Sequence, residues 1–451
     1  MIQLLRFDLL QLFRERLALQ IFFVGLIIVT IAVSTGASLR SKLKKEHLTI
    51  QSSAESYKRQ QKELWRNAPQ LELKDAIILP TQLVTTVQVP LPVLVDFAVG
   101  WSLIEPSSTD ITLRTRPDNL FTRYQIENPE RLSRGALDLT FVIVVVAPLL
   151  LIVLGYGIFC RDRDSGVAKI LLSQAGTPLK LITARSINRV LIVFIPIVSG
   201  ALFLWLSDPN ERGISVFNWL FVSFLSLLFW WSIILTVNTL RLSADTALVL
   251  LIGIWVVFVI LAPSIIFAAN SLVNSSESKF STIALARAAE IKATRTHEDE
   301  HPELSRLTLE GRQSLVQKGI EIRSAIAQAL ESVEEQEQKR VKQQLVFENS
   351  LAYISPPMLV YNHLVSIASS DKQYYRAQQI ALKNYAISLN SALSKLSLGQ
   401  KVVDELAFNT LPSFTPSPKP LQPLLPLLWL VVITIFLCSI ALIRFKNIKP
   451  L

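Results

Sequence analysis

The clearest metal-binding pattern in this sequence is HEDEH, which runs from His297 to His301. On a helix, residues four apart share a face, so His297 and His301 could bind Zn²⁺ together while Glu298 acts as general base. Such a site would make the chain a metalloprotease. Pro302 follows directly, however, and favours ending a helix at His301. We therefore interpret the run as a chance match in a surface turn and keep the zinc protease as the weakest alternative.

A second pattern is a run of alternating charges that directly follows an apolar stretch: Arg161, Asp162, Arg163 and Asp164. A short helix with these charges is a candidate contact site for a partner protein. The alternative is that the four charges only end the apolar stretch and stay solvated.

An aromatic cluster, Phe229, Trp230 and Trp231, lies inside an uncharged stretch. An uncharged wall with such side chains suits an amphipathic or lipid-like cargo better than a hydrophilic ion, so the cluster is a candidate for a substrate path. Helix packing is the alternative, because aromatic side chains dominate protein cores as well.

The elements that carry these residues are long and apolar. Of the 451 residues, 51% are hydrophobic and 18% are charged, whereas globular domains carry about 25% charged residues. Six stretches without Asp, Glu, Lys or Arg are long enough to cross about 30 Å of hydrocarbon. They lie between Arg16 and Arg40, Asp138 and Arg161, Arg189 and Asp208, Arg212 and Arg241, Asp245 and Glu277, and Lys419 and Arg444. This pattern excludes a soluble enzyme and predicts a mostly α-helical, polytopic membrane protein with six transmembrane helices.

A further uncharged run, residues 76–95, is not expected to cross a membrane. It contains Pro80, Pro90 and Pro92 together with several Thr and Gln residues. A helix in lipid tolerates neither the lost backbone donors nor so many exposed polar groups. Alternating Val and Thr instead predict extended chain in a water-exposed domain.

The charge distribution orients the six spans. If both termini are cytoplasmic, the cytoplasmic segments hold thirteen Lys and Arg residues against five Asp and Glu, which is +8 of the net charge of +10. Short cytoplasmic loops rich in Lys and Arg are typical of membrane proteins. The positive charge is therefore an orientation signal, and we expect no nucleic-acid partner. The two cysteines, Cys160 and Cys438, form no disulfide framework.

These spans divide the chain into an amphipathic segment (1–16), six transmembrane helices (17–39, 138–160, 190–207, 213–240, 246–272 and 421–443), outer domains at 40–137 and 273–420, a cytoplasmic loop at 161–189 and a cytoplasmic tail at 444–451. We expect the first outer domain to be mixed α/β, because a helix-prone basic stretch precedes the extended region. We expect the second to be helical, as a hairpin broken near Pro356 and Pro357. Its helical spacing is carried by Ile322, Ile326, Leu330 and Val333.

The composition of the spans also limits which energy source could drive transport. None has an ionisable residue in its interior, whereas proton- or ion-coupled carriers need such residues as relays. The sequence contains no GxxxxGK[ST] loop that could bind ATP phosphates. We therefore expect no cofactor and no catalysis in this chain. If ATP drives this protein, a separate subunit must bind ATP and Mg²⁺.

The chain resembles the permease subunits of type-two ATP-binding-cassette (ABC) exporters, in a subfamily with large outer domains after spans one and five. The segment MIQLLRFDLLQLFRERLALQ resembles the family's elbow helix, with Ile2, Leu5, Leu9 and Leu12 on one face. Runs beginning at Asn128 and Ser243 resemble entries to the second and fifth spans, and SPP at Ser355 resembles part of the second outer domain.

The loop RDRDSGVAKILLSQAGTP resembles the family's cytoplasmic coupling loop. The resemblance implies that its ATPase-coupling residues are Arg161, Asp162, Arg163, Asp164, Gly166, Leu171, Leu172, Ser173 and Pro178. Val167 and Ala168 replace the usual Thr and Leu, and Asp164 replaces the commoner Glu, so the contact could differ in detail.

The resemblance implies a permease that dimerises, with itself or with a related permease, in the lipid of the bacterial cytoplasmic (inner) membrane. Each copy would dock one ABC ATPase subunit on the loop between spans two and three. From the uncharged spans we expect export or extraction of an amphipathic substrate such as a lipid, lipopeptide or peptide. One alternative is mechanical transmission to a periplasmic partner without translocation. A membrane scaffold or receptor without transport is another.

Overall fold

The computed structural model describes residues 2–14, 16–115, 137–166, 178–240, 242–273, 279–300, 308–419 and 424–446. In these ranges, six helical segments are long and apolar enough to cross a membrane. They are contained in α2 (Leu17–Arg66), α6 to α8 (Leu139–Phe141, Ala147–Gly155 and Cys160–Asp164), α10 (Pro178–Ser207), α12 (Ser215–Asn238), α13 to α14 (Ala244–Trp255 and Ala262–Val273) and α20 (Leu425–Lys446). The expectation of a mostly α-helical polytopic membrane protein is confirmed.

The second and fifth spans each contain a wider π-helical turn, Val142–Val146 between α6 and α7 and Val256–Leu261 between α13 and α14. In both, a proline follows the turn, Pro148 in α7 and Pro263 in α14. Proline removes a backbone donor and crowds the preceding turn, which explains the local change in helical hydrogen bonding.

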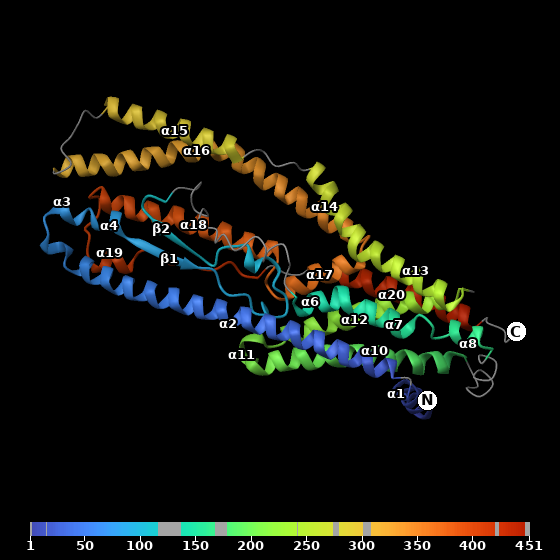
Figure 1. Ribbon diagram of the computed structural model, residues 1–451. Helices are drawn as coiled ribbons and strands as arrows, with labels where there is room; N and C mark the ends of the chain where they lie inside the picture. The colour runs from blue at the N-terminus through green and yellow to red at the C-terminus, as the bar shows by residue number, and fades with distance from the viewer. Residues whose placement is uncertain are drawn as a thin grey trace.

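Helix α2 extends far beyond the first span. Its 50 residues would be roughly 75 Å long, more than twice the thickness of the hydrocarbon layer. Figure 1 shows it running from beside α1 (Ile2–Arg14) at one end of the molecule to α3 (Leu73–Ala76) and α19 (Glu405–Asn409) at the other. One helix therefore links the first span directly to the outer part of the protein.

The two outer segments share one hydrophobic core. The first supplies the only two strands of the described ranges, β1 (Val84–Gln88) and β2 (Ser108–Thr112), which pair antiparallel with Val84 opposite Thr112. It also supplies α4 (Leu79–Gln82) and two short 3₁₀ turns (Ala68–Gln70 and Gly100–Leu103). The second supplies α18 (Lys372–Ser397), whose Tyr385 and Leu389 are buried against these strands. Trp65 of α2 packs edge to face on Phe408 of α19, with ring centroids 5.2 Å apart.

The rest of the second outer segment forms a helical arm. Helix α15 (Lys279–Glu300) packs along α16 (Leu309–Ala352), where Ile326 and Leu330 are buried against Ala286. This confirms the helical spacing expected around Ile326. Helix α16 ends before Pro356, which opens α17 (Pro356–Ile367), so the expected break is also present.

Part of the proline-rich run lies somewhere the sequence did not indicate. Val84–Gln88 is extended as expected, but residues 92–99, here called the inserted segment, enter the outer end of the helix bundle. Leu94, Phe97 and Ala98 belong to the bundle core and are fully buried. The expectation of a water-exposed segment was wrong here, because neighbouring side chains satisfy its backbone. Thr140 donates its N–H and its hydroxyl to the Phe97 carbonyl, both at 3.0 Å.

An ionic cluster closes over the inserted segment. Arg212, at the end of α11 (Pro209–Arg212), pairs with Asp96 at 2.5 Å, and both side chains are buried. Burial raises the pKa of Asp96, although the charge of Arg212 opposes this shift. Arg40 of α2 donates to the Val93 carbonyl at 2.6 Å and pairs with Glu211 at 2.5 Å. This outer clamp, Arg40, Asp96, Glu211 and Arg212, joins α2, α11 and the inserted segment.

A substitution at Gly36 tests how closely the inserted segment packs on α2. A Cβ at Gly36 would lie 2.2 Å from the Asp96 carbonyl oxygen, so Gly36→Ala must displace backbone. We expect a loss of about 1–3 kcal/mol of stability, measured as a lower unfolding temperature of the purified protein. Gly253→Ala is the matched control, because a Cβ there meets nothing within 4 Å. Equal unfolding temperatures for the two variants would contradict the close packing of the inserted segment.

Candidate functional site

Helix α8 carries the charged run that the sequence analysis singled out. The chain turns after α7 and places Arg161 at the surface, where its guanidinium donates to the Tyr156 hydroxyl at 2.5 Å and lies over that ring. Gly166, with φ of 75°, follows the helix in a left-handed conformation suited to glycine. Arg161 is therefore the member of the run that faces away from the bundle.

The other three charges of α8 point to neighbouring helices. Asp162 pairs with Arg185 of α10 at 2.5 Å. Arg163 donates to the carbonyls of Leu240 (3.3 Å) and Leu242, and Asp164 accepts the Ala244 N–H at 3.1 Å, at the start of α13. These bonds tie α8 to α10 and to the turn between α12 and α13.

A buried amide completes the attachment to α12. Asn238, at the end of α12, is fully buried. Its amide nitrogen donates to the carbonyl of Gly155 at 3.0 Å, and its amide oxygen accepts the Phe159 N–H at 3.3 Å. Asn238 thus satisfies backbone groups that the break between α7 and α8 leaves without helical partners.

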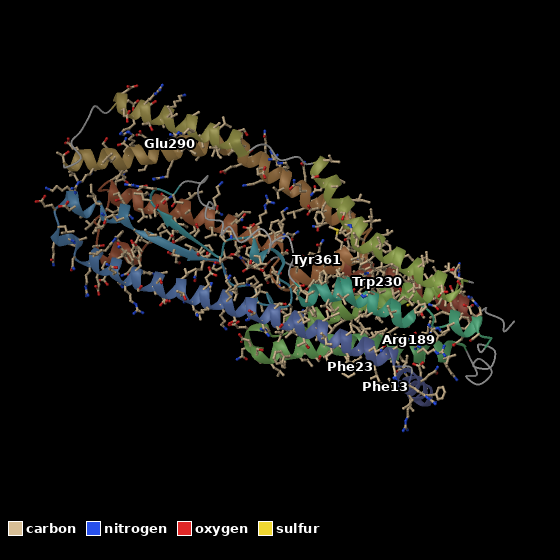
Figure 2. The ribbon with its side chains drawn as sticks, viewed as in Figure 1. Phe13, Phe23, Arg189, Trp230, Glu290 and Tyr361 are labelled. Carbon is tan, nitrogen blue, oxygen red and sulfur yellow. The ribbon has the colours of Figure 1, made fainter. Side chains whose placement is uncertain are left out.

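The N-terminal helix joins the same network through Asp8. This carboxylate is buried, accepts a hydrogen bond from Asn188 at 2.8 Å and lies 3.4 Å from Arg189, both on α10. Arg185 approaches it at 3.7 Å. Figure 2 shows Arg189 within the bundle and Phe13 at its margin. We name Asp8, Asp162, Arg185, Asn188 and Arg189 the inner network.

Sequence reasoning missed four members of the inner network. It assigned the apolar face of α1 to Ile2, Leu5, Leu9 and Leu12, but Leu9 is exposed while Asp8 and Leu12 are buried. The available signal was Arg185 and Arg189, two arginines one helical turn apart at the start of an apolar span. Such a pair requires an acidic partner when it is buried.

The remaining coupling residues are only partly described. Pro178 opens α10, which therefore starts well before residue 190, where the sequence analysis placed the third span. Leu171, Leu172 and Ser173 lie outside the described residues.

The aromatic cluster lies in the packed interior. Phe229, Trp230 and Trp231 are all buried in the bundle core, and Figure 2 shows Trp230 among the helices. The Trp231 ring approaches Gly155 of α7 closely, so it fixes the contact between the second and fourth spans. In this structure the three side chains pack against neighbouring helices, as the alternative interpretation expects.

The described HEDEH residues, 297–300, lie at the end of helix α15, so the expectation of a surface turn was wrong for them, and two of them are engaged in other bonds. His297 is buried, with Nδ1 2.7 Å from Glu321 and Nε2 3.1 Å from Ser314, so Zn²⁺ binding would break one of these contacts. A hydrogen bond from Lys318 lowers the pKa of Glu298. His301 lies outside the described residues. Among those described, no group of three His, Cys, Asp or Glu side chains is placed to hold a metal ion.

The inner network predicts a specific effect of Asp8→Asn. Removing one charge from a buried ionic cluster costs about 3–5 kcal/mol, because the arginines lose their counter-ion. We expect a lower unfolding temperature and faster tryptic cleavage at Arg14, since α1 is less firmly held on α10. Asp245→Asn, at an exposed position of α13, is the matched control. An Asp8→Asn protein with the stability and cleavage rate of the control would contradict the network.

Residues 5–448 match the family described as ABC-2 family transporter protein. No curated protein and no solved structure matches. Because the family match covers almost the whole chain, and six helices in the described ranges can cross a membrane, the chain belongs to the ABC-2 family of transporter proteins and is a multi-pass permease subunit of an ABC transporter.

Proposed function

We propose that an ABC ATPase subunit, which binds ATP and Mg²⁺, docks on α8 and the adjoining cytoplasmic loop of this permease. The observation that carries the proposal is that one α8 charge is exposed while the other three are bonded to neighbouring elements. Arg161 is exposed and available to a partner, whereas Asp162, Arg163 and Asp164 are bonded to α10 and the α12–α13 turn. A displacement of α8 would therefore be transmitted to the spans that contain α10, α12 and α13.

We further propose that the complex exports or extracts an amphipathic substrate from the bacterial cytoplasmic membrane. The six uncharged stretches contain no Asp, Glu, Lys, Arg or His, which favours a lipid, lipopeptide or peptide over an ion. Two permease copies, identical or related, would form the working unit, since closed symmetric assemblies are the commonest oligomers.

A second candidate is mechanical transmission without translocation, and helix α2 favours it. Its inner half packs on α10, the outer clamp holds its middle, and its far end carries Trp65 in the outer core. Movement of the first span would therefore be transmitted to the outer part of the protein through one continuous helix. In this mechanism the outer part would act on a periplasmic partner.

Two variants of α8 separate docking from transmission. Arg161→Glu reverses the exposed charge, and we expect about tenfold weaker co-purification of the ATPase subunit, because like charges at an interface are costly. Arg14→Glu, which reverses an exposed charge on α1, is the control. Undiminished co-purification of Arg161→Glu would contradict docking at α8.

Asp162→Asn should act differently. It breaks the link to Arg185 but leaves Arg161 exposed, so the ATPase should still co-purify while cargo movement falls about tenfold or more per ATP hydrolysed. Asp245→Asn is again the control. Full transport by Asp162→Asn would contradict transmission through Arg185.

Reconstitution distinguishes the two candidate functions. The purified complex in liposomes should move a labelled lipid or lipopeptide when ATP is added. ATPase activity stimulated by the permease, without movement of any amphipathic cargo, would instead support mechanical transmission. Failure of any ATPase to co-purify would contradict both candidates.

A further inference from the structure

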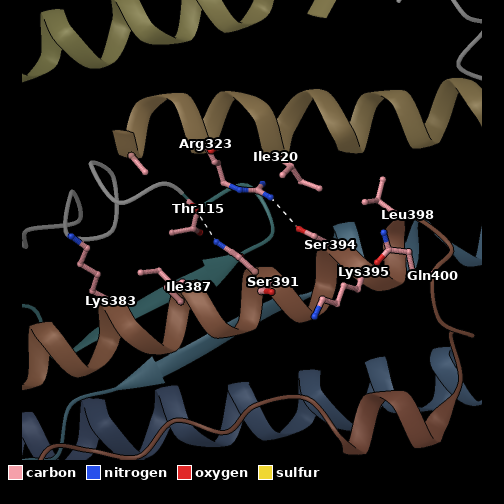
Figure 3. A pocket seen from close by; sticks show the side chains of 14 residues that line it. Thr115, Ile320, Arg323, Lys383, Ile387, Ser391, Ser394, Lys395, Leu398 and Gln400 are labelled. Atoms are coloured by element: carbon pink, nitrogen blue, oxygen red, sulfur yellow. Dashed lines mark hydrogen bonds between the residues drawn. The ribbon is translucent and has the colours of Figure 1, made fainter. Parts of the chain in front are cut away.

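A pocket of about 480 Å³ lies between α16 and α18 in the outer part of the protein. Figure 3 shows side chains of both helices entering it, with Arg323 on the upper helix and Ser394 on the lower one. Its volume is within the usual range for small-molecule sites. Its walls are mostly apolar, with Ile320, Ala386, Ile387 and Leu398 among the lining residues.

The charged residues of this pocket are all basic. The 14 lining residues include Arg323, Lys383 and Lys395 and no Asp or Glu. Lys383 pairs with Glu334 of α16, which is outside the lining set. A pocket with apolar walls and excess positive charge complements an anion attached to an apolar body.

Arg323 is a partly buried cation, and an anion in the pocket would compensate its charge. Its guanidinium donates to the Leu113 carbonyl and, at 3.2 Å, to the Ser394 hydroxyl, which uses two of its five N–H groups. Within the described chain no carboxylate lies within ion-pair distance of it. Burial lowers the pKa of Arg323, yet a guanidinium remains charged in proteins. A poorly solvated cation of this kind is stabilised by a carboxylate or phosphate.

Asn390 provides an independent sign of an incomplete site. Its amide nitrogen donates to the Thr115 carbonyl at 3.1 Å, but its buried amide oxygen has no hydrogen-bond partner among the residues that the structure describes. Buried polar atoms are rarely left without a partner. A singly protonated phosphate monoester, or a water held by the ligand, would supply one.

We propose that this pocket binds an anionic amphiphile, with its carboxylate or phosphate on Arg323 and its hydrocarbon part against Ile320, Ile387 and Leu398. The inference deepens the proposed function, because it names the class of amphipathic molecule that the outer part would receive. The site itself does not depend on the ATPase, so binding and coupling can fail separately.

Photoaffinity labelling tests the site in the full-length purified chain. The probe is a long-chain carboxylic acid with a diazirine in its tail, and labelled peptides are identified by mass spectrometry. We expect labelling within residues 320–327 and 386–398, and competition by dodecyl phosphate. Dodecyltrimethylammonium, with the same tail and the opposite charge, should not compete. Competition by inorganic phosphate alone would indicate a simple anion site and would overturn the amphiphile assignment.

Variants connect the labelling to the pocket. Arg323→Gln should reduce labelling at these peptides about tenfold, as expected for loss of a charge-assisted hydrogen bond. Arg287→Gln, at an exposed arginine of α15, is the matched control. Ser391→Trp fills the pocket while leaving Arg323 in place, so it tests the site even if Arg323→Gln folds poorly. Undiminished labelling in Ser391→Trp, or labelling confined to the membrane spans, would overturn the inference.

ATPase measurements keep the two proposals apart. If labelling at the pocket is absent while the permease still stimulates its ATPase, the ligand site is wrong and the proposed function stands. If labelling is present but no ATPase couples to the chain, the proposed function is wrong and the ligand site stands.

Discussion

The exclusion of charge from the membrane interior governs this structure. Because the six uncharged stretches contain no Asp, Glu, Lys, Arg or His, the ionic interactions of the bundle gather at its two ends. At one end Asp8 and Arg185 tie the N-terminal helix to the third span, and at the other end Asp96 and Arg212 hold the inserted segment. Buried pairs of this kind contribute little net stability, but breaking one is costly, so they define which helices move together.

The contacts of these helices connect the two ends of the protein. Helix α8 is bonded to α10 and to the turn before α13, and α2 continues from the bundle into the core that both outer segments build. An ATPase that moves α8 would therefore move the outer part as well. An anionic amphiphile bound at the proposed site beside Arg323 would lie between α16 and α18, in that outer part.

Sequence reasoning predicted the features that depend on local pattern. The six spans, the charged run at Arg161 and the helix around Ile326 follow from composition and periodicity. Contacts between distant segments carry no such signal. Trp65 meets Phe408 across more than 300 residues, so the shared outer core was not expected. The insertion around Phe97 was missed because its prolines indicated only an absence of helix. The aromatic cluster at Trp230 was ambiguous, since packing and substrate contact favour the same residue types.

Distance measurements between the two permease subunits of the proposed complex test the central claim, that ATPase closure reaches the outer part through α2. Spin labels at Arg59→Cys, on the exposed outer half of α2, would report the separation of the two outer parts after Cys160 and Cys438 are replaced. The account predicts that ATP binding shifts this distance while the distance from Arg59→Cys to a second label on α18 of the same chain stays constant. An intersubunit distance that does not respond to ATP, or a change confined to one chain, would contradict it.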